Sequence, residues 1–480
     1  MQKFTLKSLH FVSMLGLWLC VIGAKPKADF ANIQVSAQFV RLSDGKILWE
    51  EGAQTSLSPA SVTKLVTAAA VLARFTPEKT FATKIYADAR PASKVLKGNL
   101  YVKGDGDPFL VSEKLWQLAA DMKNAGLKTV SGDLVVDNSL FDSEARDESR
   151  EEGEDVSSHA YDAPISALGV NFNTVAIVIS PAAKIGAPAL VTVDPYPIEG
   201  IRIQNKAATT SGETSSLKVT RITLNDGVEA MNVTGKIGIG KQPQKIYRSL
   251  GNASTLSGRY IKAFFENEGI EIKGKVRTGS VPSSAMEISS VESYEMQKLV
   301  SGLNKFSNNY IADVMVKRVG AAFGSTSSDL PQSGSLASGT KVITDFMQQD
   351  VGIKSPMVIK NGSGLNTDNR LSAAQIVSLL KYMEQRLDLF PEFLVSLPAA
   401  GWDGTMSKRF ADSKFKGMVR AKTGTLSQPI SVSSLAGYFR SSEHGLVAFA
   451  IIHNGVVGKP QPPLDVLRDQ QDELLHSFLK

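Results

Sequence analysis

The sequence predicts an α/β fold in which the two ends of the chain form one unit of helices and sheet, interrupted by a long and mostly β insertion. Three observations support this prediction. An alternating segment and an Ala-rich apolar run stand near the N-terminus, short strand-like segments fill the region from about 91 to 281, and helical periodicity returns from about residue 292. The chain has 480 residues, 42% of them hydrophobic and 21% charged, which is enough for two to four globular domains.

The first 24 residues have the composition of a secretory signal peptide. Lys3 and Lys7 precede an apolar stretch from Leu9 to Ala24, and polar residues follow it. The stretch is too short for a comfortable membrane span, which favours a cleaved leader over an uncleaved anchor, although the anchor stays open as an alternative. The single cysteine, Cys20, lies inside this segment, so we expect a mature chain without disulfides, a thiol nucleophile or cysteine metal ligands.

The segment after the leader predicts a β-hairpin followed by a buried helix. Val35 to Glu50 alternates apolar and polar residues on both sides of Asp44-Gly45, which is typical of a hairpin. The run from Ser61 to Ala73 is apolar and rich in Ala, and Pro59 stands where the first turn of a helix begins. We therefore expect Ser61 at the N-terminal end of a core helix.

The middle of the chain predicts strands separated by turns. Examples lie at 99–103, 218–224 and 270–276. The acidic stretch from Asp142 to Asp155 predicts a solvated loop, because like charges repel and extend the chain. The expected division is a leader at 1–24, a discontinuous outer domain at 25–93 and 286–480, a first inserted domain at 94–190 and a second, β-rich inserted domain at 191–285.

The C-terminal part returns to regular helices and strands. Helices are predicted at 295–303, 310–320 and 372–387, strands at 418–422, 434–439 and 446–453, and a final amphipathic helix at 464–479.

A Ser-x-x-Lys spacing places a hydroxyl and an amine one helical turn apart on the same face, so that the amine can deprotonate the hydroxyl. Ser61 and Lys64 have this spacing, but alone it is weak, because six other pairs share it. Those pairs begin at Ser43, Ser215, Ser338, Ser378, Ser413 and Ser477. What distinguishes Ser61 is its position at the start of an apolar helix, where the helix dipole favours negative charge. A lysine in that first turn is poorly placed for the dipole and calls for another explanation.

Two further motifs follow in order. Ser307-Asn308-Asn309 stands in a short break between two predicted helices, where helix capping is a structural alternative. Lys422-Thr423-Gly424-Thr425 ends a predicted strand, and Gly424 weakens a strand unless another group must approach its backbone closely. Ser-x-x-Lys, Ser-Asp-Asn and Lys-Thr-Gly, in this order, are typical of penicillin-binding proteins and class A β-lactamases, although Asn308 replaces the usual Asp here.

The sequence resembles the low-molecular-mass class C penicillin-binding proteins, which are D-alanyl-D-alanine carboxypeptidases and endopeptidases. The resemblance covers almost all of the mature chain. Beyond the three motifs it includes segments at 104–108, 137–141, 161–168, 361–365 and 397–405, and the wide gap between Ser61 and Ser307. It implies a DD-peptidase/β-lactamase-like domain, with an antiparallel sheet flanked by helices, and a periplasmic or other extracytoplasmic location.

The resemblance also implies a mechanism. Ser61 would attack the carbonyl of the penultimate D-Ala and form an acyl-enzyme, with a neutral Lys64 taking its proton. Keeping a lysine neutral near pH 7 means lowering its pKa from about 10.4, which disfavours the charged form by roughly 4 to 5 kcal/mol. Ser307 would relay the proton to the leaving amine, and Asn309 would hold Lys64 and the substrate.

The remaining binding roles follow from the same resemblance. Backbone amides of Ser61 and Thr425 would form the oxyanion hole, and Lys422, Thr423 and Thr425, around Gly424, would bind the terminal carboxylate. Ser427 is expected to contact the stem peptide. Peptidoglycan stem peptides are the implied substrates and β-lactam antibiotics the implied covalent inhibitors.

Three positions depart from the family pattern. Asn361 stands where Asp is expected, Thr367 where Arg is frequent and Ser427 where Gln is frequent. Because the last two family positions help to recognise the diamino-acid side chain of the stem peptide, we expect this enzyme to recognise that side chain differently or less strictly.

The alternatives are a β-lactamase and a non-catalytic peptidoglycan-binding protein with a relic site. A Ser-His-Asp hydrolase is disfavoured because Asn361 breaks the Gly-x-Ser-x-Gly pattern around Ser363 and His453 follows an apolar strand. Gly235 to Gln242 lacks the hydroxyl residue of a phosphate loop, and metal ligands do not cluster, so no metal or cofactor is expected. The net charge of +6 is too dispersed to indicate nucleic acid, and membrane association is expected to be at most peripheral.

Overall fold

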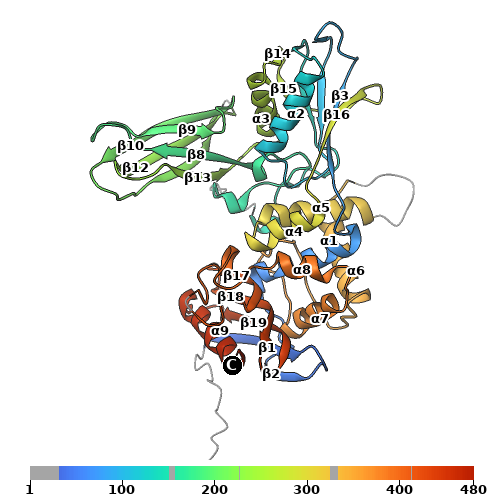
Figure 1. Ribbon diagram of the computed structural model, residues 1–480, viewed down its shortest axis with the longest axis vertical. Helices are drawn as coiled ribbons and strands as arrows, with labels where there is room; N and C mark the ends of the chain where they lie inside the picture. Colours follow the sequence, from blue (N-terminus) through green and yellow to red (C-terminus); the bar gives the residue numbers. More distant parts are fainter. Residues whose placement is uncertain (1–31, 151–156, 226, 325–332, 412, 480) are drawn as a thin grey trace, which may run out of the picture.

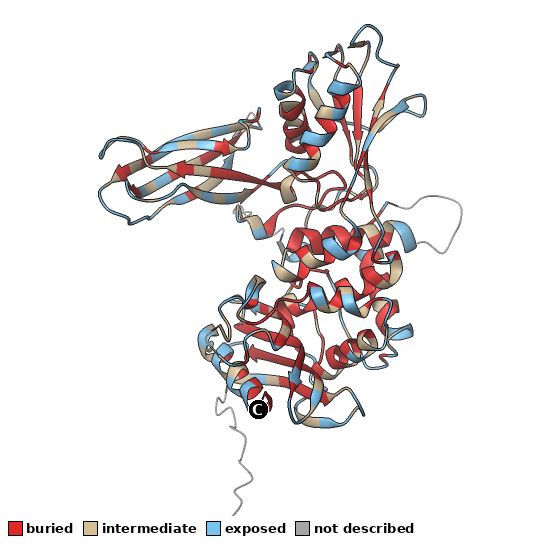
Figure 2. Ribbon diagram, viewed as in Figure 1, coloured by how far each residue is buried: buried red, intermediate tan, exposed pale blue. Residues whose placement is uncertain are grey.

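The computed structural model describes residues 32–150, 157–225, 227–324, 333–411 and 413–479, and the expected signal peptide lies outside these residues. Figure 1 shows three parts: a body at the bottom that contains both ends of the described chain, an α/β unit at the top, and an arm of strands that projects to the left. Figure 2 shows that buried residues run through the helices and the sheet of the body.

The body is built on a five-stranded antiparallel sheet with the order β17-β18-β19-β1-β2. Its strands are β1 (Ile33–Arg41), β2 (Ile47–Glu51), β17 (Val419–Leu426), β18 (Val432–Ser441) and β19 (Gly445–Gly455). The expected hairpin around Asp44-Gly45 is confirmed, since β1 pairs with β2. The C-terminal helix α9 (Leu464–Phe478) packs on the sheet, where the rings of Phe39 and Phe478 stack at 4.4 Å. Because the sheet order places β17 at an edge, its outer backbone groups face away from the sheet.

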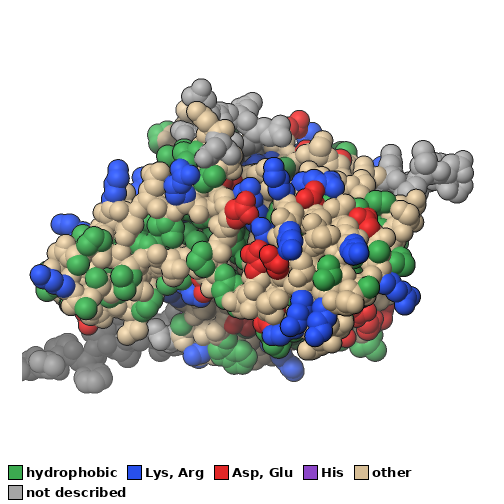
Figure 3. Space-filling view, turned by 90° about the horizontal axis from the view of Figure 1, so that it is seen from above, with side chains coloured by type: hydrophobic (Ala, Val, Ile, Leu, Met, Phe, Trp, Pro, Cys, Tyr) green, Lys and Arg blue, Asp and Glu red, His purple; other side chains and the backbone are tan. Residues whose placement is uncertain are grey.

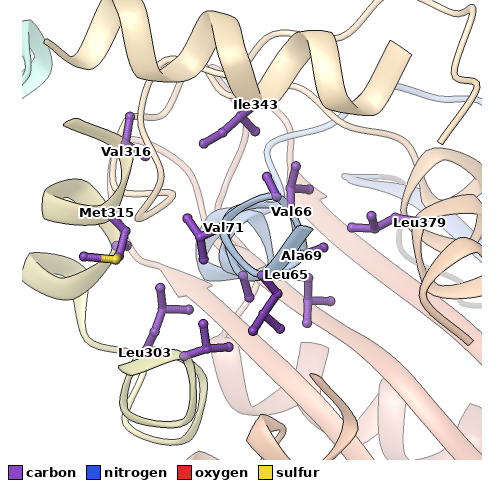
Figure 4. Packing of buried hydrophobic residues seen from close by; sticks show 14 of the residues in the cluster. Leu65, Val66, Ala69, Val71, Leu303, Met315, Val316, Ile343 and Leu379 are labelled. Carbon is purple, nitrogen blue, oxygen red and sulfur yellow. The ribbon is translucent and has the colours of Figure 1, made fainter. Parts of the chain in front are cut away.

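Helix α1 (Thr63–Phe75), preceded by the 3₁₀ turn η1 (Ala60–Val62), is the centre of the helical layer. Around it lie α4 (Met296–Lys305), α5 (Asn309–Phe323), α6 (Leu336–Gln349), α7 (Ala373–Glu384) and α8 (Phe390–Ser396). Figure 4 shows Leu65, Val66, Ala69 and Val71 of α1 surrounded by side chains of the neighbouring helices. Its mostly apolar sequence is therefore explained by burial of nearly the whole helix, which confirms the expected core helix.

In the described part of the insertion there are four sheets, which form two parts. The upper unit has the order β15-β7-β5-β3-β16 and a small sheet β14-β6-β4. Its elements are β3 (Ala82–Ala87), β4 (Val95–Leu96), β5 (Leu100–Lys103), α2 (Ser112–Asn124), β6 (Thr129–Val130), β7 (Leu134–Asp137), α3 (Ala253–Asn267), β14 (Glu271–Ile272), β15 (Val276–Thr278) and β16 (Met286–Glu292). The arm pairs β13-β8-β9 and β10-β12-β11. Its strands are β8 (Thr174–Ser180), β9 (Leu190–Asp194), β10 (Ile201–Thr210), β11 (Lys218–Thr223), β12 (Glu229–Gly238) and β13 (Gln244–Ser249).

This pairing is nested rather than consecutive. The upper unit combines strands from both sides of the arm. The boundary expected between residues 190 and 191 falls inside β9 and assigns most of this strand to a different domain from its partner β8. We therefore propose that the arm at about 174–249 is inserted into the upper unit at about 82–292. Helices α2 and α3 were not expected in a mostly β insertion.

The surface carries interspersed charges of both signs on the face seen in Figure 3, which looks down on the upper unit and the arm. Among the described residues, no helix combines the length and the hydropathy that crossing a membrane requires.

Candidate active site

Ser61 and Lys64 meet at the junction of η1 and α1. Lys64 is fully buried, and its Nζ lies 3.0 Å from Ser61 Oγ, whereas Ser61 is only partly buried. Ala60, just before Ser61, has a positive φ of 46°, a conformation that non-glycine residues rarely adopt. Such strain is common where a side chain must be held in a functional direction.

Strand β17 approaches this junction closely, and Gly424 is the reason it can. A Cβ on Gly424 would lie 2.7 Å from the carbonyl oxygen of Pro59 and 3.1 Å from the amide nitrogen of Ser61. The close approach that a glycine in a strand led us to expect is therefore present. Gly424 lies against the backbone of Pro59 and of Ser61, the candidate nucleophile. Any side chain at 424 would push the edge strand away from Ser61.

Lys422 and Ser307 form a second amine–hydroxyl pair. Lys422 is fully buried, and its Nζ donates to Ser307 Oγ at 2.8 Å and to the Thr423 carbonyl at 2.7 Å. Ser307 has a positive φ of 53° in the turn between α4 and α5. Burial, and then the nearby charge of Lys64, lower the pKa of Lys422 well below its usual value.

Asn309 begins α5 and connects it to Lys64. Its Oδ1 accepts a hydrogen bond from Lys64 Nζ at 2.7 Å, and its Nδ2 donates to the Tyr161 carbonyl at 2.9 Å. Asn308 caps the helix by accepting from the Ile311 amide. The helix cap considered as the structural alternative is therefore present at Asn308, while Asn309 contacts Lys64 and Ser307 contacts Lys422.

The loop at 361–365 supplies a contact to Lys64 that the sequence analysis did not assign. The Ser363 carbonyl accepts from Lys64 Nζ, and Ser61 Oγ lies 3.4 Å from the same carbonyl. Buried Asp313 on α5 holds this loop by accepting from the Gly362 and Ser363 amides at 3.0 and 2.9 Å. Because Asp313 lies about 50 residues from Gly362 and Ser363 in the chain, no local sequence pattern indicated these hydrogen bonds.

The structure explains one departure from the family pattern, the asparagine at position 361. Its Nδ2 donates to buried Asp147 at 2.8 Å, while its Oδ1 accepts from the Gly364 amide and from Asn369. An amide can donate and accept at once, whereas an ionised carboxylate can only accept. The solvated loop expected for the acidic stretch is accordingly wrong for Asp147, which is buried, and for Asp142, which forms an ion pair with Lys317.

The other predicted binding residues lie along the exposed end of β17. Thr423 Oγ1 donates to Thr405 Oγ1 at 2.7 Å, and Thr425 and Ser427 are exposed. A pocket at the end of the strand is lined by Thr367, Leu426 and Gln428 together with Tyr161, while Ser427 is not among its lining residues.

Among the described residues, no group of three or more His, Cys, Asp or Glu side chains could hold a metal ion. His453 is buried on β19, as expected for a structural residue, and burial lowers its pKa to about 4.

The site thus combines two buried amines, each beside a serine hydroxyl, with an edge strand that lies against the first serine. This is the arrangement of the serine acyl-transfer enzymes that carry Ser-x-x-Lys and Lys-Thr-Gly motifs.

Comparison with known proteins agrees with this class. Residues 24–476 match the model of the D-Ala-D-Ala carboxypeptidase 3 (S13) family. A D-alanyl-D-alanine carboxypeptidase of Actinomadura sp. (strain R39) is 33% identical over 88% of this chain and 78% of its own length. The D-alanyl-D-alanine carboxypeptidase DacB of Haemophilus influenzae is 25% identical over 89% of both chains. The crystal structure of H. influenzae penicillin binding protein 4 has the same fold, with a TM-score of 0.74 and 23% identity over 93% of this chain and 96% of its own. The chain belongs to the D-Ala-D-Ala carboxypeptidase 3 (S13) family.

Proposed function

We propose that the protein is a serine DD-peptidase that hydrolyses D-Ala-D-Ala termini or D-Ala cross-links of peptidoglycan through an acyl-enzyme on Ser61. The observation that carries the proposal is the 3.0 Å contact between Ser61 Oγ and the buried amine of Lys64, at the helix end against which Gly424 packs. A hydroxyl becomes an effective nucleophile when a base stands within hydrogen-bond distance of it.

The hydrogen bonds of Lys64 suit it to the role of base. A neutral amine has two N–H donors and one lone pair. Asn309 Oδ1 and the Ser363 carbonyl can only accept, so they take the two donors. The lone pair then remains for the O–H of Ser61. In this arrangement Ser61 loses its proton to Lys64 as its oxygen bonds to the substrate carbonyl carbon.

Ser307 and Lys422 serve the leaving group. The bond between the carbonyl carbon and the leaving nitrogen breaks as Ser307 gives that nitrogen a proton. The proton that Lys64 took from Ser61 replaces it, directly or by way of Lys422, whose Nζ lies 2.8 Å from Ser307 Oγ. Water then attacks the ester carbonyl carbon. Lys64, neutral again, takes a proton from this water and returns it to Ser61 Oγ as the ester bond breaks, which frees Ser61 and leaves the carboxylic acid product. The Ser61 and Thr425 amides stabilise the oxyanion, each worth on the order of 3 kcal/mol.

The substrate carboxylate binds Lys422, Thr423 and Thr425. The side chain of the stem peptide residue before D-Ala enters the pocket lined by Thr367 and Gln428. Because Thr367 brings no charge, we propose that the enzyme accepts diaminopimelate and lysine stem peptides with similar efficiency. A strong preference for free diaminopimelate in side-by-side turnover would contradict this part.

We propose further that residues 1–24 are a signal peptide that exports the enzyme to the periplasm or an equivalent wall space, where peptidoglycan is available. The apolar stretch after Lys3 and Lys7 supports this. N-terminal sequencing of the secreted protein would identify the cleavage site.

Labelled penicillin separates the alternatives. A long-lived adduct on Ser61 is expected for a DD-peptidase, rapid release indicates a β-lactamase, and no adduct indicates a non-catalytic binding protein. The H. influenzae penicillin binding protein 4 has itself been crystallised in complex with a β-lactam. Product analysis on linear and cross-linked muropeptides completes the test: Ser61→Ala is expected to lose both the adduct and hydrolysis, and full activity in this variant would refute the proposal.

A further inference from the structure

A pocket of about 460 Å³ borders β17 on the side of Thr423 and Thr405. Every residue that lines it is polar, basic or glycine, and none is acidic or apolar. Its lining residues include Thr405, Lys408, Arg409, Thr423, Thr425 and Arg468. The volume is in the range of sites that hold small molecules or a few peptide residues, and the composition suits an anionic ligand.

The charges of this pocket are only partly compensated. Arg409 is paired with Asp472 on α9. Lys408 and Arg468 are exposed and form no ion pair with another residue that the structure describes. Two cations therefore remain available to a ligand.

The direction of the substrate assigns the pocket to the leaving group. An edge strand binds an extended peptide through its unpaired backbone groups, and the reacting carbonyl lies at Thr425 in the proposed mechanism. Residues after Thr425 line the pocket for the acyl part, which includes Leu426 and Gln428. Residues before it, with Thr405, line the basic pocket and so lie beside the departing peptide.

We propose that this basic pocket binds carboxylates of a leaving peptide longer than one D-Ala, so that Lys408 and Arg468 select cross-linked substrate. The inference rests on the proposed function. A terminal D-Ala has a single carboxylate, which Lys422, Thr423 and Thr425 already bind, and it offers nothing to cations farther out. The acceptor stem peptide of a cross-link carries further carboxylates on the leaving side.

The test compares kcat/KM of the full chain on a soluble cross-linked muropeptide dimer and on a linear muropeptide ending in D-Ala-D-Ala. In the double variant Lys408→Ala/Arg468→Ala, kcat/KM for the dimer is expected to fall about tenfold. This fall should be at least about fivefold larger than the fall in kcat/KM for the linear peptide. The matched control Lys414→Ala/Arg440→Ala removes the same charges from exposed positions outside the pocket and is expected to keep the wild-type ratio between the two substrates.

The outcomes separate the two claims. An equal loss of kcat/KM on both substrates would mean that the two cations attract anions from a distance or support the fold. This result would overturn the inference and leave the proposed function standing. An unchanged double variant would overturn it as well. If the wild-type protein cleaved neither substrate, the proposed function would fail, and the inference with it.

Discussion

Lys422 and Lys317 are buried to the same extent, but their surroundings are opposite in charge. Lys317 on α5 forms an ion pair with Asp142 and donates to the Glu144 carbonyl. Lys422 donates to a hydroxyl and a carbonyl, and the nearby charge that lowers its pKa is that of another lysine, Lys64. A buried lysine that meets a carboxylate stabilises the structure, whereas one that meets a second lysine is retained at a cost and points to chemistry.

The largest effect that this comparison predicts is slower acylation by penicillin in the variant Lys422→Met. The variant removes the amine beside Ser307 and is expected to slow penicillin acylation by about 10³-fold, in the range of lost acid–base and electrostatic catalysis. Its free energy of unfolding should stay within about 1 kcal/mol of wild type, because the lost hydrogen bonds are offset by removal of an unpaired buried charge. Stopped-flow acylation and urea unfolding check the two parts, and strong destabilisation would contradict the comparison.

Lys317→Met should behave in the opposite way. Removing one partner leaves Asp142 without its cation, at an expected cost of about 2 to 3 kcal/mol in unfolding free energy, with acylation kept within twofold. The partner variant Lys317→Met/Asp142→Asn is expected to regain part of the loss. If the double variant were no more stable than the single one, the ion pair would not be the cause.

His453 extends the comparison to a second buried base. Burial lowers its pKa to about 4, below the ordinary value of 6.5, so the unfolded chain binds the proton first as the pH falls. Stability is therefore fully present above about pH 6.5 and is lost toward pH 4, by roughly 2 kcal/mol at pH 4.5. His453→Gln should flatten this part of the pH dependence of the melting temperature. An unchanged slope would show that other groups control it.

The smallest predicted effect concerns two neighbouring carboxyl groups, in place of the two neighbouring lysines. Asn361→Asp would place a second carboxyl group against buried Asp147, and one of the two would stay protonated, at a cost of about 1 to 2 kcal/mol. The swap Asn361→Asp/Asp147→Asn restores one donor and one acceptor and is expected to recover most of the stability in thermal unfolding. A swap as unstable as the single variant would refute this account of the departure from the family pattern.

Much of the body could be predicted because its signals are local. The hairpin at β1 and β2, the apolar helix α1 and the strand that carries Gly424 each have a pattern within about 15 residues. The motif residues Ser61, Lys64, Ser307, Asn309 and Lys422 meet in one site, as the resemblance implied.

Helix α2 was missed although it has a local signal, since its buried residues Leu115, Leu118, Ala119 and Met122 recur at helical spacing. The other missed features depend on contacts between distant segments. Asp313, the Ser363 carbonyl and the pair of Asn361 with Asp147 act through hydrogen bonds that span from about 50 to 300 residues. Neither periodicity nor spacing reports such contacts, because each partner alone looks like an ordinary polar residue.

The points where the insertion leaves and re-enters the body lie side by side. The Ser293 amide donates to the Phe81 carbonyl at 2.7 Å, the Phe81 amide donates to Ser293 Oγ at 2.9 Å, and β3 and β16 continue the pairing outward. Joining ends 212 residues apart through a flexible chain would cost roughly 5 kcal/mol in loop-closure entropy. If the insertion folds first, pairing of β3 with β16 brings Phe81 and Ser293 together before the body folds. The loop-closure entropy is then lost during folding of the insertion and not during folding of the body. Ser61 and its distant partners on α5 and β17 would then assemble as readily as in a shorter chain without the insertion.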